Sequence, residues 1–86
     1  MSDLQQQFEQ AQNDVTLLSD RPGNLTLLRL YALFKQATQG DAGQDRPDDM
    51  VGRYKHDAWA SLKGTPADTA KHQYVELVES LKAGAE

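Results

Sequence analysis

Three neighbouring residues in the middle of the chain carry side chains that could bind a nucleotide. Tyr31, Phe34 and Lys35 lie in the stretch LYALFKQATQGD, with the second and third residues three and four positions after the first. On a helix, residues at these spacings share one face, so the rings and the ammonium group are expected to project together. An aromatic ring stacks on a base, and a lysine meets a phosphate as a compact charge. A core helix with one lysine that extends its stem along apolar surface would show the same pattern, so both interpretations stay open.

The residues that most often carry catalysis or bind metals are few and poorly spaced in this sequence. His56 and His72 stand sixteen positions apart on different expected helices, and no further ligand lies at a paired spacing. His56 and Asp57 are neighbours, which on a helix point about 100° apart and form no ready-made dyad. The chain contains no cysteine, which excludes a disulfide, a thiolate metal site and a cysteine nucleophile. We therefore expect no catalytic residues, no enzyme activity, no metal and no cofactor, and we interpret both histidines as helix-surface residues.

The composition bounds the size of the domain and the nature of its partners. The chain has 86 residues, which predicts a single domain over 1–86, and its net charge of −4 argues against binding to nucleic acid or anionic membranes. Seven of the nine cations lie between positions 21 and 63, which indicates either a local site for a small anion or a solvated surface of mixed charge. No apolar run is long enough to span a membrane, and the first residues lack the pattern of a signal peptide. We therefore expect a cytoplasmic protein without membrane insertion.

Periodic apolar residues predict two helices in the first half of the chain. A capping box that starts at Ser2 opens the first helix, which is expected to end near Ser19. Its apolar stripe consists of Leu4, Phe8, Ala11, Val15 and Leu18. The second helix is expected over 25–38, with Asn24 as its N-cap and Gly40 as its C-terminal stop. Apolar residues cover more than one face of this helix, which is typical of a central helix or of one that lends a face to a ligand.

The second half of the chain predicts a long polar segment and two more helices. The segment 39–49 is rich in turn-forming residues and is either a functional loop or a mobile linker. The third helix is expected over 50–62, and the fourth begins with Thr65 as a cap and Pro66 in the first helical position. The expected buried row of the third helix is Val51, Tyr54, Ala58 and Leu62, with Trp59 alongside as a core anchor. The apolar stripe of the fourth is Ala70, Tyr74, Leu77, Val78 and Leu81. Four amphipathic helices without a strand predict an all-α bundle.

Several stretches of the sequence follow one another in a recognisable order: LYALFKQATQGD, RP, KHDAWASLKG and QYVELVESLK. In this order they closely resemble the acyl-CoA-binding protein family, and the likeness covers essentially the whole chain. The resemblance implies a four-helix bundle of up-down-down-up topology that holds one long-chain fatty acyl-CoA non-covalently. It also implies a monomeric carrier and pool former without catalytic turnover.

The resemblance further implies a role for each residue that matches a functional position of the family. Tyr31 and Lys35 would hold the 3′-phosphate of the ribose through a hydroxyl and a charge, and Phe34 would stack on adenine. Lys55 would be a second phosphate-binding cation, and Tyr74 would complete the aromatic wall around the ligand. The matches near the acyl-chain groove are Phe8, Ala11 and Leu28, and the match to a position that is often basic near the headgroup is Arg21.

The sequence departs from the family pattern at three places. Phe34 stands where many members have tyrosine, so stacking is retained and any hydroxyl contact is lost. The stretch from Arg46 to Asp57 is shorter than in the commonest form, which leaves Arg53 and Lys55 as alternatives for the second phosphate-binding cation. His56 stands where the family usually has tryptophan.

Two other classes of function are compatible with the predicted bundle. An apolar groove between helices would also accept a partner helix, which makes a protein-interaction module the alternative to an acyl-CoA carrier. An acyl-CoA hydrolase would need a nucleophile or a base, and the sequence supports neither.

Overall fold

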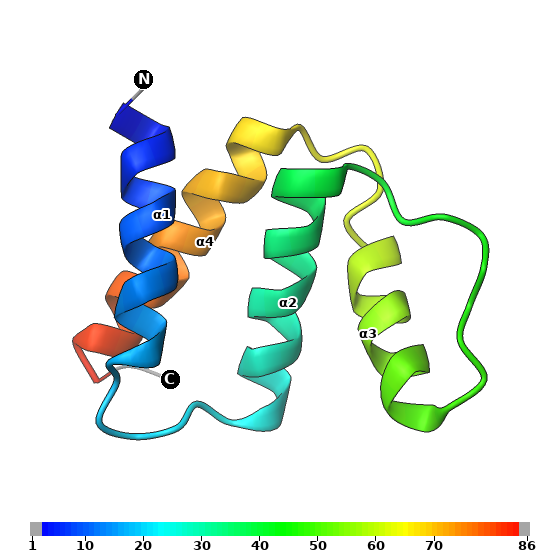
Figure 1. The fold of residues 1–86 in the computed structure, drawn as a ribbon, viewed down its shortest axis with the longest axis horizontal. Coiled ribbons are helices and arrows are strands. Elements are labelled where there is room, and N and C mark those ends of the chain that lie inside the picture. Colours follow the sequence, from blue (N-terminus) through cyan, green and yellow to red (C-terminus); the bar gives the residue numbers. More distant parts are fainter. Residues whose placement is uncertain (1–2, 85–86) are drawn as a thin grey trace.

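The computed structural model describes residues 3–84, and this part of the chain forms helices and no strand. The helices are α1 (Asp3–Thr16), α2 (Asn24–Gln39), α3 (Met50–Ala60) and α4 (Ala67–Lys82). Helices α1 and α4 run in one direction, while α2 and α3 run together in the opposite direction (Figure 1). The predicted up-down-down-up bundle is therefore confirmed. The predicted capping box at Ser2 lies outside the described residues.

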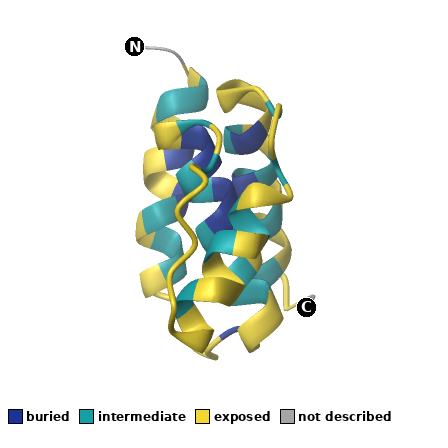
Figure 2. Ribbon diagram, turned by 90° about the vertical axis from the view of Figure 1, so that its right-hand side faces the viewer, coloured by how far each residue is buried: buried dark blue, intermediate teal, exposed yellow. Residues whose placement is uncertain are grey.

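The bundle is flat, with Cα extents of 34 × 31 × 16 Å. Helix α4 packs against both α1 and α2, whereas α3 packs against α2 alone among the described helices. Side chains from α1, α2 and α4 therefore supply the buried core, which Figure 2 shows as the dark blue interior of the ribbon. The buried cluster consists of Phe8, Ala11, Leu30, Leu33, Ala37, Ala70, Tyr74 and Val78. This confirms the apolar stripes that periodicity predicts for α1 and α4.

Helix α1 ends three residues earlier than the sequence predicts. The N–H of Leu17 donates to the carbonyl of Asp14 at 3.0 Å, and the N–H of Leu18 donates to that of Val15. Bonds that reach back three residues tighten the last turn and end an α-helix. Leu18 continues the apolar stripe, but it lies beyond the helix.

The predicted N-terminal caps of α2 and α4 are both wrong by one position. Gly23 is the N-cap of α2, and Asn24 is already helical, with its side-chain oxygen accepting from Arg21 at 3.3 Å. At α4 the carbonyl of Pro66 accepts the N–H of Ala70 at 3.0 Å, so Pro66 rather than Thr65 is the N-cap. Neither helix has a side-chain cap.

The C-terminal stop of α2 is confirmed. Gly40 has a φ of +81°, and its N–H donates to the carbonyl of Gln36. A glycine adopts this conformation without the steric cost that a Cβ would impose.

Helix α3 begins at a side-chain cap that explains a glycine in its first turn. The carboxylate of Asp49 accepts the N–H of Gly52 at 2.8 Å. A Cβ at Gly52 would lie 2.7 Å from the Asp49 carboxylate and 2.8 Å from the ring of Pro47, so no larger residue fits without a shift.

The predicted buried row of α3 is wrong. Val51 and Tyr54 are 61% and 56% exposed, Ala58 and Leu62 are half-buried, and α3 contributes no buried residue. Periodicity identifies an apolar face, but only the packing partners decide whether that face is covered. Helix α2 is the one described helix that packs against α3, and it leaves Val51 and Tyr54 exposed, while α1 and α4 lie on the far side of α2 (Figure 1).

The segment between α2 and α3 runs along the outside of α3 and is tied to it (Figure 2). The guanidinium of Arg46 forms two hydrogen bonds with the carboxylate of Asp57, at 2.8 and 3.0 Å. His56 bonds the carbonyl of Gly43 through Nε2 at 2.7 Å, while its Nδ1 lies 3.8 Å from Asp57, too far for a hydrogen bond. His56 therefore holds the loop, which corrects its interpretation as a simple surface residue, whereas His72 is exposed as expected.

Candidate ligand-binding site

Two lysines from different helices converge on one tyrosine ring. The Nζ of Lys35, on α2, lies 5.8 Å from the centroid of the Tyr31 ring, and the Nζ of Lys55, on α3, lies 5.3 Å from it. Both distances are within the range of a cation–π interaction. We call these three residues the lysine–tyrosine cluster. All three are predicted site residues, and the parallel packing of α2 and α3 brings them together.

The cluster has an excess of positive charge. Among the described residues, neither Lys35 nor Lys55 forms an ion pair, whereas Lys82 and Arg46 pair with carboxylates. Two ammonium groups that share one ring without a neutralising carboxylate form a site suited to an anion with more than one charge. The tyrosine hydroxyl adds a hydrogen-bond donor to the same site.

Trp59 anchors α3 to the end of α2 beside this cluster. Its indole N–H donates to the carbonyl of Gly40 at 2.7 Å, and the Nζ of Lys35 lies 5.5 Å from its ring. The residue is half-buried and lies outside the buried cluster of the core. Trp59 is therefore an anchor, as predicted, but it acts through a hydrogen bond at the rim rather than through burial in the core.

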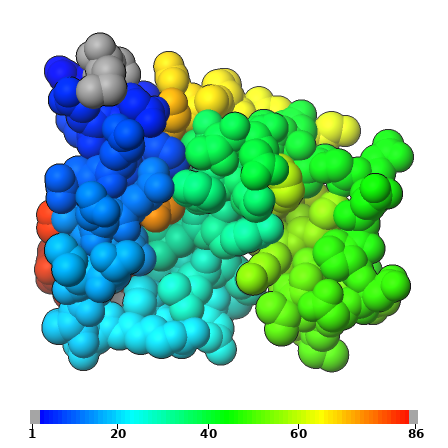
Figure 3. Space-filling view, in the orientation of Figure 1, coloured from blue at the N-terminus to red at the C-terminus, as the bar shows by residue number. Residues whose placement is uncertain are grey.

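A groove lies next to the cluster, between α2 and α3. It has a volume of about 760 Å³, and Tyr31 and Lys55 form part of its wall. The other lining residues are Arg21, Asn24, Leu25, Leu27, Leu28, Val51 and Tyr54. Figure 3 shows the surface hollowed between the teal atoms of α2 and the green atoms of α3. We call this cavity the α2–α3 groove; its floor is apolar, and cations stand at its edge.

Several residues of the groove are absent from the predicted site. Val51 and Tyr54 were expected in the core, yet they line the groove, and Leu25 is 83% exposed beside them. The sequence does contain a signal for them. Apolar residues cover more than one face of α2, and such a helix is fully buried only if other helices cover each of those faces. Within residues 3–84, only α3 and α4 pack against α2.

The remaining predicted site residues form a second aromatic group on the other side of α2. The ring of Phe34 stacks on that of Phe8 with centroids 6.1 Å apart, and the ring of Tyr74 meets Phe8 edge-on at 5.1 Å. Phe8 and Ala11 are buried in the core, and neither lines the α2–α3 groove. Burial raises the pKa of the Tyr74 hydroxyl above its ordinary value. The fold thus separates Phe8, Ala11 and Tyr74 from the lysine–tyrosine cluster, with Phe34 between the two groups.

One further cation lies at this aromatic group and was not predicted as a site residue. The Nζ of Lys71, on α4, lies 5.9 Å from the centroid of the Phe8 ring. Of the alternatives left open by the sequence, Lys55 lies on Tyr31, whereas Arg53 is exposed and does not line the groove.

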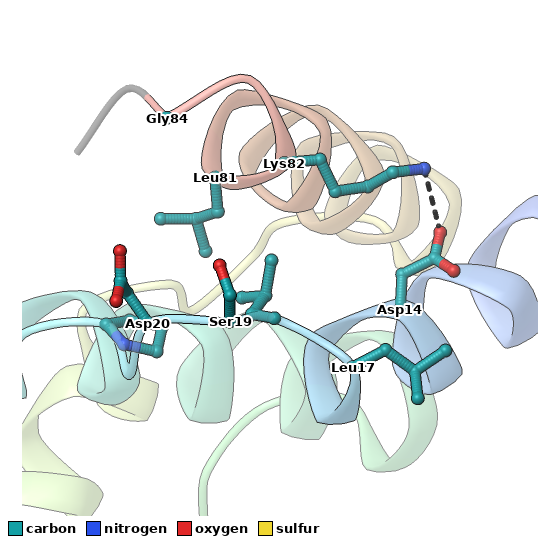
Figure 4. A pocket seen from close by; sticks show the side chains of 9 residues that line it. Asp14, Leu17, Ser19, Asp20, Leu81, Lys82 and Gly84 are labelled. Atoms are coloured by element: carbon teal, nitrogen blue, oxygen red, sulfur yellow. Dashed lines mark hydrogen bonds and ion pairs between the residues drawn. The ribbon is translucent and has the colours of Figure 1, made fainter.

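Another cavity lies at the far end of the bundle, between the end of α1 and the end of α4. It has a volume of about 480 Å³, and the ammonium of Lys82 reaches across it to the carboxylate of Asp14 at 3.1 Å (Figure 4). Hydrogen bonds from Gln10 and Lys82 lower the pKa of Asp14. The ammonium at this cavity is therefore already paired with a carboxylate, in contrast to the two lysines of the lysine–tyrosine cluster.

Comparison with known proteins places the chain among acyl-CoA-binding proteins. The family model described as "Acyl CoA binding protein" matches residues 5–78. The acyl-CoA-binding protein of Saccharomyces cerevisiae is 42% identical over 93% of this chain and 94% of its own length. The crystal structure of Oryza sativa acyl-CoA-binding protein 2 aligns with a TM-score of 0.88 at 35% identity, covering 94% of this chain and 92% of that one.

A longer relative shares the same region. Enoyl-CoA delta isomerase 2 of Rattus norvegicus is 48% identical over the whole of this chain, which corresponds to 22% of the isomerase. The chain therefore spans about a fifth of that relative. No helix among the described residues is long and apolar enough to cross a membrane.

Proposed function

Because this chain belongs to the acyl-CoA-binding protein family, we propose that it binds one long-chain fatty acyl-CoA non-covalently, as a carrier and pool former. The observation that carries the proposal is the convergence of Lys35 and Lys55 on Tyr31 at the edge of an apolar groove. An acyl-CoA has the matching chemistry, since it joins an anionic nucleotide to a long apolar chain. Its 3′-phosphate would meet the lysine–tyrosine cluster, and its acyl chain would occupy the α2–α3 groove.

The residues of the second aromatic group would act on the nucleotide in different ways. Phe34 is half-buried one turn from Tyr31, so part of its ring is accessible for stacking on adenine. Phe8 packs against that ring and Tyr74 packs against Phe8, so the two would fix the orientation of the Phe34 ring. Ala11 is buried in the same core cluster, and its small side chain would shape the packing near these rings. Leu28 lines the α2–α3 groove directly and would contact the acyl chain.

We propose that binding occurs without catalytic turnover. The family is described as a binding family, and the isomerase relative matches this chain over about a fifth of its own length, so its chemistry is not carried over by the likeness. The described residues contain no group of three side chains able to hold a metal ion. A monomeric state and a cytoplasmic location remain predictions.

Calorimetric titration with palmitoyl-CoA, free CoA and free palmitate tests the proposal. Burying a methylene contributes up to about 0.8 kcal/mol, so palmitoyl-CoA should bind far more tightly than CoA. The two lysines should make palmitoyl-CoA bind more tightly than palmitate, and added salt should weaken that advantage.

Each ligand also reports on one part of the assignment. Equal affinity for palmitate and palmitoyl-CoA would contradict the phosphate site, and equal affinity for CoA and palmitoyl-CoA would contradict the groove. Binding to none of the three ligands would contradict the function as a whole and return the protein-interaction module to consideration.

A further inference from the structure

The α2–α3 groove shares two of its wall residues with another cavity. This second cavity has a volume of about 470 Å³, and Leu25 and Leu28 line both cavities. Its apolar wall continues along α2 through Ala32, onto α3 through Ala58 and onto the following turn through Leu62. We call it the distal cavity. Since Tyr31 and Lys55 line only the α2–α3 groove, the two leucines separate the distal cavity from the lysine–tyrosine cluster.

We propose that the distal cavity receives the methyl end of long acyl chains, which pass Leu25 and Leu28 after filling the α2–α3 groove. This inference rests on the proposed function and adds to it a second acyl compartment that sets the preferred chain length. The two leucines are then specificity-determining residues, because their side chains form the passage between the compartments.

The contact between α2 and α3 is suited to such a passage. Helix α3 contributes no buried residue, and Leu25 is 83% exposed at the junction of the two cavities. Leucine side chains make no hydrogen bonds, so an acyl chain can displace them from each other without breaking a polar contact. An apolar chain that leaves the groove here meets another apolar wall instead of water, which is favourable for each methylene that follows.

Polar residues in the wall of the distal cavity limit the length of chain that it accepts. Arg29, Ser61 and Gln73 also line the cavity, and a methyl group that reached them would meet polar side chains. Affinity should therefore rise with chain length while methylenes enter the distal cavity and level off when the chain meets these residues. Each buried methylene is worth up to about fourfold in affinity.

A filled distal cavity would test the inference. Ala58 lines that cavity, while Ala60 lies two residues further along α3 in an exposed position and lines neither cavity. Binding of octanoyl-, dodecanoyl-, palmitoyl- and arachidoyl-CoA should be compared for the wild type, Ala58→Phe and the matched control Ala60→Phe. We expect Ala58→Phe to bind octanoyl-CoA like the wild type and palmitoyl-CoA at least about tenfold more weakly, whereas Ala60→Phe leaves the whole series unchanged.

The outcomes separate this inference from the proposed function. Failure of the wild type to bind any acyl-CoA would overturn the proposed function itself. Normal octanoyl-CoA binding by Ala58→Phe together with undiminished palmitoyl-CoA binding would overturn the distal compartment alone.

A measurement on the wild-type protein decides the matter if Ala58→Phe fails to fold. Stearoyl-CoA with a nitroxide near its methyl end should broaden the amide NMR signals of Ala58, Ser61 and Gln73, which line the distal cavity. Broadening confined to Val51 and Tyr54, which line only the α2–α3 groove, would overturn the inference.

Discussion

The two sides of helix α2 face different surroundings. On one side Leu30, Leu33 and Ala37 are buried in the core cluster, to which α1 and α4 also contribute. On the other side Leu25, Leu28 and Tyr31 line a groove whose opposite wall, on α3, is largely exposed. The same run of apolar residues thus supplies a core and a binding surface. A chain of 86 residues has little apolar surface to spare, so leaving one side open indicates that this side is covered by something other than the chain itself.

The two halves of the molecule are also held together by different interactions. The half formed by α1, α2 and α4 is joined by buried apolar contacts. Polar contacts join α2 to the segments on either side of α3: the buried amide of Gln36 donates to the Asp41 carboxylate at 2.8 Å and to the Thr65 carbonyl at 2.9 Å. The same carboxylate accepts the N–H of Gly64 at 2.8 Å. This polar junction, formed by Gln36, Asp41, Gly64 and Thr65, fixes α3 at its C-terminal end and leaves the groove free.

The largest expected effect compares the same substitution on the two sides of α2. Leu30 is 5% exposed and Leu25 is 83% exposed. Leu30→Ala should lower the free energy of unfolding by about 2–5 kcal/mol, because it removes buried methyl groups and leaves a cavity. Leu25→Ala should change it by about 0.5 kcal/mol or less, yet weaken binding of palmitoyl-CoA. Urea unfolding and ligand titration of both variants measure these effects, and equal losses of stability would contradict the division of α2 into two sides.

The next effect tests the charge on the open side. If Lys35 meets the 3′-phosphate, Lys35→Ala removes a charge-assisted hydrogen bond worth about 1.5–3 kcal/mol. Affinity for palmitoyl-CoA should then fall roughly tenfold to hundredfold. The loss should be much smaller with palmitoyl-dephospho-CoA, which lacks that phosphate. Tyr31→Phe should give the same ligand-dependent pattern more weakly, because a neutral donor contributes less than a charged one.

A nearby cation provides the control for Lys35. Arg53 is exposed on α3 and lies outside the groove, so Arg53→Ala should leave both affinities close to those of the wild type, while Lys55→Ala should resemble Lys35→Ala. Equal losses with the two ligands, or an unfolded Lys35→Ala variant, would make Lys35 a structural residue.

A third prediction concerns the polar junction between the halves. Gln36→Ala removes two hydrogen bonds and should lower the free energy of unfolding by about 1–3 kcal/mol. Because the junction holds α3, amide hydrogen exchange should accelerate more in α3 than in α1 or α4. Gln39→Ala, at an exposed position of the same helix, is the matched control and should change neither property. Uniform acceleration across all helices would show that the junction belongs to the common core.

The sequence predicts most of the fold because helical periodicity and glycine stops are local signals. Gly40 ends α2, and Ala70, Tyr74 and Val78 are buried on α4, as these signals indicate. The N-caps of α2 and α4 are off by one residue, because the carbonyl that opens a helix is set by the path of the preceding loop. Val51 shows the larger limit: an apolar period marks a face, but it says nothing about what covers that face.

The site is only partly predictable for a related reason. Tyr31 and Lys35 are one turn apart on a helix, so their proximity follows from spacing. Phe34 and Lys35 are adjacent, which makes their side chains diverge by about 100° and allows Phe34 to pack on Phe8 instead of Tyr31. The choice between Lys55 and Arg53 depends on how α3 is rotated against α2, and no local pattern records that rotation.

The smallest expected effect is the response of the polar junction to acid. Hydrogen bonds from Gln36 and from the Gly64 N–H lower the pKa of Asp41 below its ordinary value of 3.8. A carboxyl whose pKa is lower in the folded state stabilises that state fully at pH values above the unfolded pKa, and this stabilisation is lost as the pH falls through the folded pKa. The contribution of Asp41 should therefore be constant from neutral pH down to about pH 5 and decline below about pH 4. Asp41→Asn removes this titration, so the difference in unfolding free energy between wild type and variant should shrink in acid.

Three measurements check this expectation and connect it to the two halves of the molecule. Carbon NMR of the Asp41 carboxyl should give a pKa below 3.8, and urea unfolding of wild type and Asp41→Asn at several pH values should give curves that converge in acid.

Asp14→Asn is the comparison in the other half, because Asp14 joins α1 to α4 and its pKa is also lowered. On acidification of the wild type, loss of the Asp41 contacts should lower the protection of α3 amides relative to their intrinsic exchange rates at the same pH, and Asp14→Asn should leave this response in place. Asp41→Asn should abolish this acid response of α3, because the variant lacks the Asp41 contacts at every pH and its α3 amides are already poorly protected at neutral pH. If Asp41→Asn leaves the acid response of α3 unchanged, the junction does not hold α3.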